Sequence, residues 1–171
     1  TFIAYDDHSP ILSTDPWFGD QDHAYFGSWT LSHEIPKQYK NDVLNSKYLW
    51  FSHGHPDHLN PISLKRFEGK SILLPDHVGS RIYQDLGERN YDIQILPDRK
   101  WVDLTNKIKV LCITTIMQDS ILLMDIGGKL FINLNDAGTR GCTRFIRKEE
   151  KKYKDIFLLS LSGYGDADMI N

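Results

Sequence analysis

Short apolar segments recur along this chain of 171 residues, and most of them are hydrophobic at successive positions. Their length and their β-branched content predict strands. Because they present apolar side chains to both faces, we expect sheets that are covered on both sides. A glycine pair at 127–128 separates two of the segments and predicts a hairpin turn there. The segments lie at residues 48–51, 71–74, 93–96, 108–113, 121–126, 130–132 and 156–159.

Four stretches between these strands favour helices. Residues 36–46 begin with a proline, and residues 60–67 begin with Asn60 as an N-cap followed by Pro61. Residues 78–87 carry apolar side chains every four positions and end at Gly87, which predicts a stop. Residues 143–153 contain the charged run 148–152, which we interpret as a solvated helix face. Strands with interspersed helices indicate a single domain of the α/β or α+β class.

Composition excludes several classes of protein. The chain has 20 Lys and Arg against 23 Asp and Glu, a net charge of −3, so no basic field favours nucleic acid. Two cysteines without a Cys-x-x-Cys spacing argue against a disulfide scaffold and fit a cytoplasmic location. The longest apolar runs are too short to span a membrane. We therefore expect a small-molecule substrate as the partner, and the oligomeric state stays open.

Three histidines and an aspartate fall within six residues, in the segment SHGHPDHL that starts at Ser52. They follow an apolar strand and precede the Pro61 helix, and a glycine and a proline between them let the backbone turn sharply. Imidazole and carboxylate ligands suit Zn²⁺, Fe or Mn, and the absence of cysteine disfavours a closed structural zinc site. The sequence thus predicts a metal site built from His53, His55, Asp57 and His58.

This segment resembles the HxHxDH signature of the metallo-β-lactamase superfamily. The resemblance implies an α/β fold of the αββα sandwich type, with two mixed β-sheets flanked by helices. It implies that His53 and His55 hold one metal ion, and that Asp57 and His58 hold a second. The segment 131–137 resembles the part of the superfamily that carries a bridging aspartate, which makes Asp136 the fifth candidate ligand. Residues 11–17 resemble the strand and loop that precede the motif in the lactonase-like and phospholipase-like branches.

A closer resemblance is to the metallo-β-lactamase-like domain of the CMP-N-acetylneuraminate hydroxylases. It rests on residues 27–36, which resemble that family's GWWLLHEPP segment, and on residues 52–64 and 133–140. Those hydroxylases also carry a Rieske iron–sulfur domain, which needs two Cys and two His. No Cys-x-His pairing occurs in this chain, so the full hydroxylase activity is not carried over.

Two histidine ligands that the superfamily pattern calls for have no counterpart. The stretch 112–120 has Thr115 and Gln118 where a third histidine is expected, and the stretch 161–168 has Tyr164, Asp166 and Asp168 near the position of the last one. The remaining five candidates could hold one ion with open positions or two ions weakly. Since the chain starts with Thr1 in a strand-like segment, we expect residues 1–171 to form one domain trimmed at both ends.

Three functions stay open at this stage. The first is a hydrolase in which one or two Zn²⁺ ions activate a water molecule that Asp57 orients or deprotonates. The second is an iron-dependent oxidoreductase component that binds a sugar nucleotide. The third is a degenerate domain that binds a ligand without catalysis. Aromatic residues before the motif either line a substrate pocket or pack in the core, and these are Trp17, Phe18, Tyr25, Phe26 and Trp29.

Overall fold

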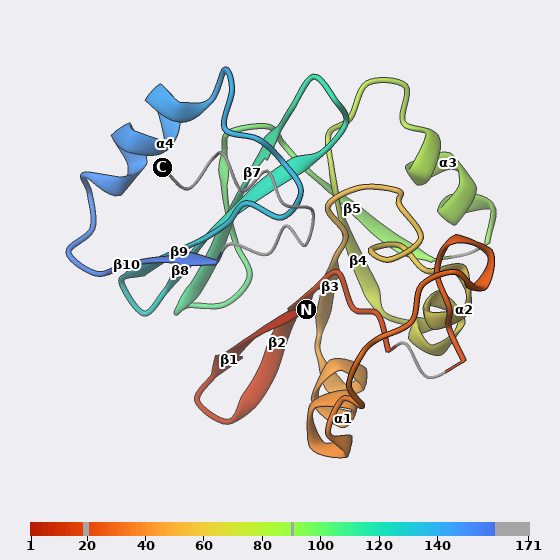
Figure 1. Cartoon of the computed structure of the whole chain (residues 1–171). Coiled ribbons are helices and arrows are strands. Elements are labelled where there is room, and N and C mark those ends of the chain that lie inside the picture. Colours follow the sequence, from red (N-terminus) through yellow and green to blue (C-terminus); the bar gives the residue numbers. More distant parts are fainter. Residues whose placement is uncertain (19–20, 90, 160–171) are drawn as a thin grey trace.

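The computed structural model describes residues 1–18, 21–89 and 91–159. Ten strands form two five-stranded mixed sheets (Figure 1). The first sheet runs in the order β1 (Phe2–Asp6), β2 (Ser9–Thr14), β3 (Tyr48–Trp50), β4 (Ser71–Pro75) and β5 (Asp92–Leu96). The β1–β2 pair is antiparallel, and the other pairs are parallel.

The second sheet has the order β10-β9-β8-β7-β6, and only β10 runs parallel to its neighbour. Its strands are β6 (Trp101–Asp103), β7 (Ile108–Thr114), β8 (Ser120–Ile126), β9 (Lys129–Asn133) and β10 (Ile156–Leu159). The helices lie outside the pair of sheets, with α4 (Thr143–Glu150) against the second sheet (Figure 1). The helices of the first sheet are α1 (Lys37–Asn45), α2 (Pro61–Leu64) and α3 (Arg81–Glu88), and the short 3₁₀ turns are η1 (Tyr25–Gly27) and η2 (Lys65–Phe67).

Three apolar layers hold this sandwich together. Between the sheets, Leu12 and Leu73 of the first sheet pack in the same cluster as Val110 of the second. Alternate residues of the same strands point outward, so that Ile72 packs with the helices of the first sheet and Leu111 packs in the cluster that includes α4. The runs are apolar at successive positions because both faces of each sheet are covered. The predicted αββα fold with two mixed sheets is confirmed.

The helices differ from the prediction in detail. Helix α3 begins at Arg81, and Val78 lies before it with 89% of its surface exposed, so it does not belong to the buried helix face. Gly87 does not stop this helix, which continues to Glu88. In α4, the charged run is not wholly solvated, because Glu149 is buried and accepts hydrogen bonds from Trp101 and Lys152.

The hairpin between β8 and β9 forms where the glycine pair predicts it. Gly127 and Gly128 have φ angles of 60° and 82°, the left-handed conformation that a tight two-residue hairpin turn requires. Among the helices of the described residues, none combines the length and the apolarity needed to cross a bilayer.

Candidate metal centre

The candidate site lies where strands from both sheets end. Asp15 follows β2, the histidine motif follows β3, and Asp136 follows β9, so the loops that carry the functional side chains all begin at the carboxyl end of a strand. Loops held by rigid strands are where binding residues usually sit. Ser120 at the start of β8 ties the two sheets together here, because its hydroxyl donates a 2.7 Å hydrogen bond to the carbonyl of Ser52.

Asn60 fixes the end of the motif loop. Its Oδ1 accepts hydrogen bonds from the backbone N–H groups of Ile62 and Ser63, at 2.9 and 3.1 Å, as an N-cap does. Its Nδ2 donates to the carbonyl of Pro56 at 3.0 Å, inside the motif. The predicted cap is confirmed, and it also couples the start of α2 to the loop that carries the histidines.

We expect Asn60→Ala to lower the free energy of unfolding by about 1–2 kcal/mol, because the cap and the tie to the loop are lost together. Urea denaturation followed by circular dichroism measures this change. Asn45→Ala, at an exposed position at the end of α1, is the matched control and should change stability by less than about 0.5 kcal/mol. Equal effects of the two substitutions would contradict the role given to Asn60.

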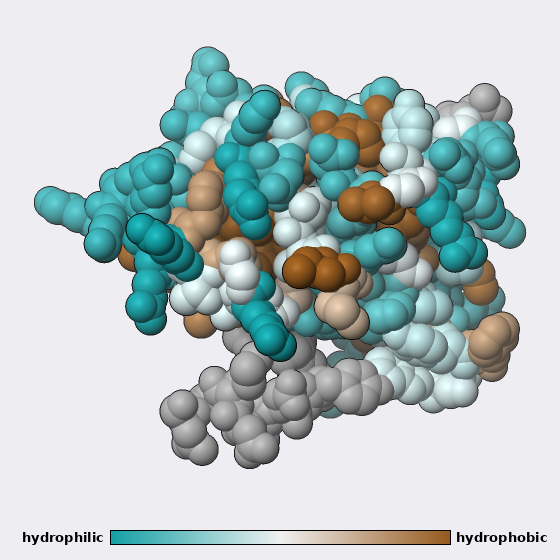
Figure 2. All heavy atoms as spheres, turned by 90° about the horizontal axis from the view of Figure 1, so that it is seen from above, coloured by the Kyte–Doolittle hydropathy of each residue, from teal (hydrophilic) through white to brown (hydrophobic). Residues whose placement is uncertain are grey.

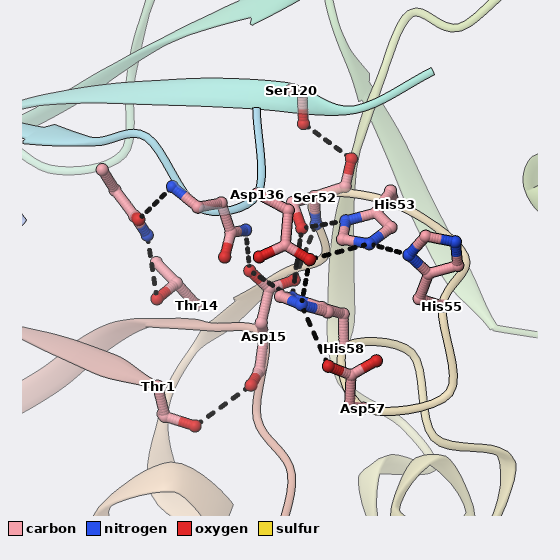
Figure 3. Close-up of polar contacts among 12 residues, drawn as sticks. Thr1, Thr14, Asp15, Ser52, His53, His55, Asp57, His58, Ser120 and Asp136 are labelled. Atoms are coloured by element: carbon pink, nitrogen blue, oxygen red, sulfur yellow. Dashed lines mark hydrogen bonds and ion pairs between the residues drawn. The ribbon is translucent and has the colours of Figure 1, made fainter. Parts of the chain in front are cut away.

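The structure brings all five predicted side chains together (Figure 3). His53, His55 and Asp136 form one group in which single ligand atoms lie within 4.8 Å of one another, and Asp57, His58 and Asp136 form a second such group. Asp136 belongs to both, and in Figure 3 its carboxylate faces His53 and His58. Its Oδ2 is 3.2 Å from His58 Nε2 and 3.8 Å from His53 Nε2.

A buried hydrogen-bond chain orients His53. The amide and the hydroxyl of Ser52 both donate to Asp15 Oδ1, at 2.7 and 3.0 Å, and Ser52 Oγ lies 2.8 Å from His53 Nδ1. Because the serine proton is used toward Asp15, Ser52 accepts the proton of His53 Nδ1. The lone pair of His53 is then on Nε2, which faces His55 Nδ1 at 2.7 Å and the carboxylate of Asp136. This tautomer is the one in which His53 can bind a metal ion through Nε2.

Two residues of the site adopt the left-handed backbone conformation. Asp15 has a φ angle of 41° and Asn135 one of 54°, and the side chain of Asn135 donates a hydrogen bond to Asp15 Oδ2. Aspartate and asparagine tolerate this conformation better than most residues, yet such positions are concentrated at functional sites. The two turns bring the side chain of Asp15, which follows the first sheet, into contact with that of Asn135, which follows the second.

The electrostatics of the site centre on His58. Burial alone would lower the pKa of this imidazole, but the carboxylates of Asp136 and Asp15 outweigh burial and raise it to about 10. Burial likewise opposes ionisation of Asp15, yet hydrogen bonds from His58, Ser52 and Asn135 lower its pKa. The pKa of Asp136 is lowered mainly by its contact with His58. In the metal-free protein, a protonated His58 therefore balances the negative charges of Asp15 and Asp136.

In the stretch 112–120, where a third histidine is expected, Asp119 is an acidic residue that lies near the motif. Its Oδ1 is 3.8 Å from His53 Nδ1, on the side of the ring away from Asp136, and its carbonyl accepts hydrogen bonds from Thr115. Gln118 lines the second cavity together with His53 and His55. Tyr164, Asp166 and Asp168 lie outside the described residues.

Two cavities adjoin the site. The first, of about 920 Å³, is lined by Asp57, His58 and Asp136, and the second, of about 630 Å³, is lined by His53 and His55. Of the aromatic residues noted in the sequence, Trp17, Phe18 and Trp29 line the first cavity, as does His33. Tyr25 instead donates a 3.0 Å hydrogen bond to Asp57 Oδ1, and Phe26 is fully exposed.

Sequence reasoning missed the buried support of the site. Four residues that support the site were not among the candidates: Asp15, Ser52, Asn135 and Asp119. Ser52 and Asp119 lie beside His53, Asp15 lies beside His58, and Asn135 donates a hydrogen bond to Asp15. The signal that could have found Asp15 is its position directly after an apolar strand, in the segment Thr14-Asp15-Pro16. A carboxylate that is buried at such a position needs hydrogen-bond partners, which points to a polar site nearby.

The predicted resemblance to CMP-N-acetylneuraminate hydroxylases is confirmed by comparison with curated proteins. The chain is 26% identical over 137 residues to the cytidine monophosphate-N-acetylneuraminic acid hydroxylase of Asterias rubens, covering 74% of this chain and 20% of that protein. It is 24% identical to the enzyme of Danio rerio, covering 76% of this chain and 22% of that protein. It is 23% identical to the inactive hydroxylase of Homo sapiens, covering 76% of this chain and 26% of that protein. The chain thus spans about a quarter or less of the length of these relatives.

Among solved structures, the chain is similar to Igni18, a metallo hydrolase of Ignicoccus hospitalis, with a TM-score of 0.48 and 14% identity over 80% of this chain and 61% of that one. A metal-dependent hydrolase of Parabacteroides distasonis gives a TM-score of 0.49 and 11% identity over 95% and 79% of the two chains. No family model matches the sequence.

Proposed function

We propose that residues 1–171 act as one metal-dependent hydrolase domain, in which His53, His55, Asp57, His58 and Asp136 hold one or two divalent cations. The observation that carries this proposal is the pair of ligand groups that share Asp136. A shared carboxylate reduces the repulsion between two neighbouring cations. Imidazole and carboxylate donors fit Zn²⁺, with Fe or Mn as alternatives, and the tautomer that Ser52 imposes on His53 puts its lone pair on Nε2, the atom that faces Asp136.

When bound, such cations would polarise the substrate and make water a stronger nucleophile near neutral pH. Within the chain, Asp57 is the residue that we propose to orient or deprotonate this water. The Tyr25 hydroxyl donates to Asp57 Oδ1, which holds the carboxylate in place, while Oδ2 lies 3.5 Å from His58 Nε2. Asp57 also lines the larger cavity, so its carboxylate is within reach of a bound substrate.

Metal removal tests this proposal. We expect protein purified without added metal to contain zinc by mass spectrometry, and chelation to lower the melting temperature by roughly 5–10 °C, because a tightly bound ligand stabilises only the folded state. Adding back Zn²⁺ should restore the melting temperature, whereas Mg²⁺, which prefers oxygen ligands, should not. Dialysed protein with less than about a tenth of an equivalent of Zn, Fe or Mn would contradict the proposal.

A second candidate is an iron-dependent oxidoreductase component, and the similarity to the sialic-acid hydroxylases favours it. In that case a separate protein or domain would supply the electrons, because among the described residues no candidate ligand group contains a cysteine. Iron in anaerobically purified protein would favour this candidate over the hydrolase. A degenerate binding domain is the third candidate, and it predicts that His53→Ala with His58→Ala leaves ligand binding unchanged.

Both cysteines are buried free thiols, which supports our proposal of a reducing compartment such as the cytoplasm.

A further inference from the structure

The first cavity changes character along its length. At one end it is lined by Asp57, His58 and Asp136 of the candidate metal centre. Away from them it extends over β1 and toward α1, and its walls there are largely apolar. The apolar side chains come from β1, from the residues that follow β2 and from the segment before α1: Phe2, Ile3, Trp17, Trp29, Leu31 and Ile35. At about 920 Å³ the cavity is large enough for a drug-sized group.

The charges of this cavity are unsuited to an anion. Its described lining contains no Lys or Arg, and besides the carboxylates of the site it includes that of Glu34. Its basic groups are the imidazoles of His33 and His58 and the α-amino group of Thr1. His58 is already in contact with Asp15 and Asp136, and burial lowers the pKa of the Thr1 amino group, which disfavours its charged form. A phosphate or carboxylate moved into this space would lose its hydration without gaining a full counter-charge.

The second cavity has a mixed lining of apolar and charged side chains. It meets the site from the side of His53 and His55, and its lining includes the guanidinium of Arg81 and the imidazole of His77. Gln118 and Asp119 of the β7–β8 loop add polar groups to its lining, and Leu74, Ile82 and Met117 add apolar ones. Seen from above, as in Figure 2, the surface shows only small apolar areas among hydrophilic ones. The candidate metal centre therefore stands between a largely apolar cavity without Lys or Arg and a mixed cavity that contains Arg81.

We propose that the first cavity binds an uncharged apolar group of the substrate, an alkyl chain or an aromatic ring system, beside the bond that is cleaved. The role of this group as part of a substrate rests on the proposed hydrolase function, whereas its binding requires only the cavity. Apolar surface that leaves water in this cavity supplies the affinity, and the absence of Lys and Arg discriminates against nucleotides there.

The test uses the whole chain and the uncharged fluorescent probe N-phenyl-1-naphthylamine, whose emission rises in apolar surroundings. We expect saturable binding with one probe per chain, both with Zn²⁺ and after chelation. Leu31→Asp and Ile35→Asp each place a carboxylate in the apolar wall and should weaken binding by at least about tenfold. Val78→Asp introduces the same charge at an exposed residue of the second cavity and should change the dissociation constant by less than about twofold.

Cytidine monophosphate at millimolar concentration should leave the bound probe in place. Displacement by the nucleotide, absence of saturable binding, or equal weakening by Val78→Asp and Leu31→Asp would overturn the proposal. Circular dichroism verifies that the variants are folded. If a variant does not fold, the competition with cytidine monophosphate, which uses the unaltered chain, still tests the proposal. If the metal-free chain binds the probe, the apolar binding site exists whether or not the domain is a hydrolase. The metal analysis described above tests the hydrolase function independently.

Discussion

Replacing Asp136 with alanine is expected to remove both metal sites at once. Asp136 belongs to both ligand groups, whereas each of the other four candidate ligands belongs to one. We expect Asp136→Ala to raise the dissociation constant for Zn²⁺ by at least about 100-fold, more than the loss of a residue that merely orients a ligand. Competition with a chromophoric chelator, followed by mass spectrometry of the dialysed protein, measures affinity and stoichiometry.

Two single-group variants make the test of Asp136 specific. His55→Ala should remove only the site that includes His53, and Asp57→Ala only the site that includes His58. Because the Asp136 side chain is about one-third exposed, its loss should change the unfolding free energy of the metal-free protein by less than about 1 kcal/mol. Unchanged zinc content in Asp136→Ala would show that this carboxylate is not a ligand.

Replacing Asp15 with alanine should have the largest effect on stability. The buried carboxylate accepts hydrogen bonds from the amide and the hydroxyl of Ser52 and from Asn135, and it lies 3.5 Å from His58. Its loss leaves these buried donors unpaired and removes a counter-charge from His58. We expect Asp15→Ala to lower the free energy of unfolding by about 3–5 kcal/mol in urea denaturation of the metal-free protein.

Asp98 offers a matched control for Asp15. Its Oδ1 also accepts from one backbone amide and one hydroxyl, both of Thr114, at 2.8 and 3.1 Å. The side chain of Asp98 is 32% exposed, whereas that of Asp15 is 6% exposed. Asp98→Ala should therefore cost only about 1 kcal/mol, since water can replace the lost bonds. Equal losses for the two variants would show that burial of Asp15 does not determine its contribution.

The layered fold could be predicted from the sequence because its signals are local. Runs that are apolar at successive positions indicate sheets covered on both faces, and a glycine pair or an Asn-Pro start indicates a turn or a cap within a few residues. The same holds for the motif His53 to His58, whose spacing is contained in one loop. Strand β6 was missed because its third residue is Asp103, so that only two apolar residues stand in succession there.

The support of the site could not be predicted because it depends on contacts distant in sequence. Ser52 is 37 residues from Asp15, and Asn135 is 120 residues from it, so no spacing rule connects them. Helix α3 shows a local failure of another kind: an apolar side chain at the expected spacing, Val78, lies before the helix and is exposed. Periodicity identifies a possible buried face, and only the tertiary arrangement decides where the helix begins.

The position of Asp136 has a mechanical consequence for the sandwich. Asp136 follows β9 of the second sheet, whereas the other four candidate ligands follow β3 of the first. A cation held by both would cross-link the two layers at this edge, much as a disulfide joins two distant segments. Separation of the sheets would then require release of the ion, so slow hydrogen exchange at the ends of β3 and β9 should appear and disappear together with the metal.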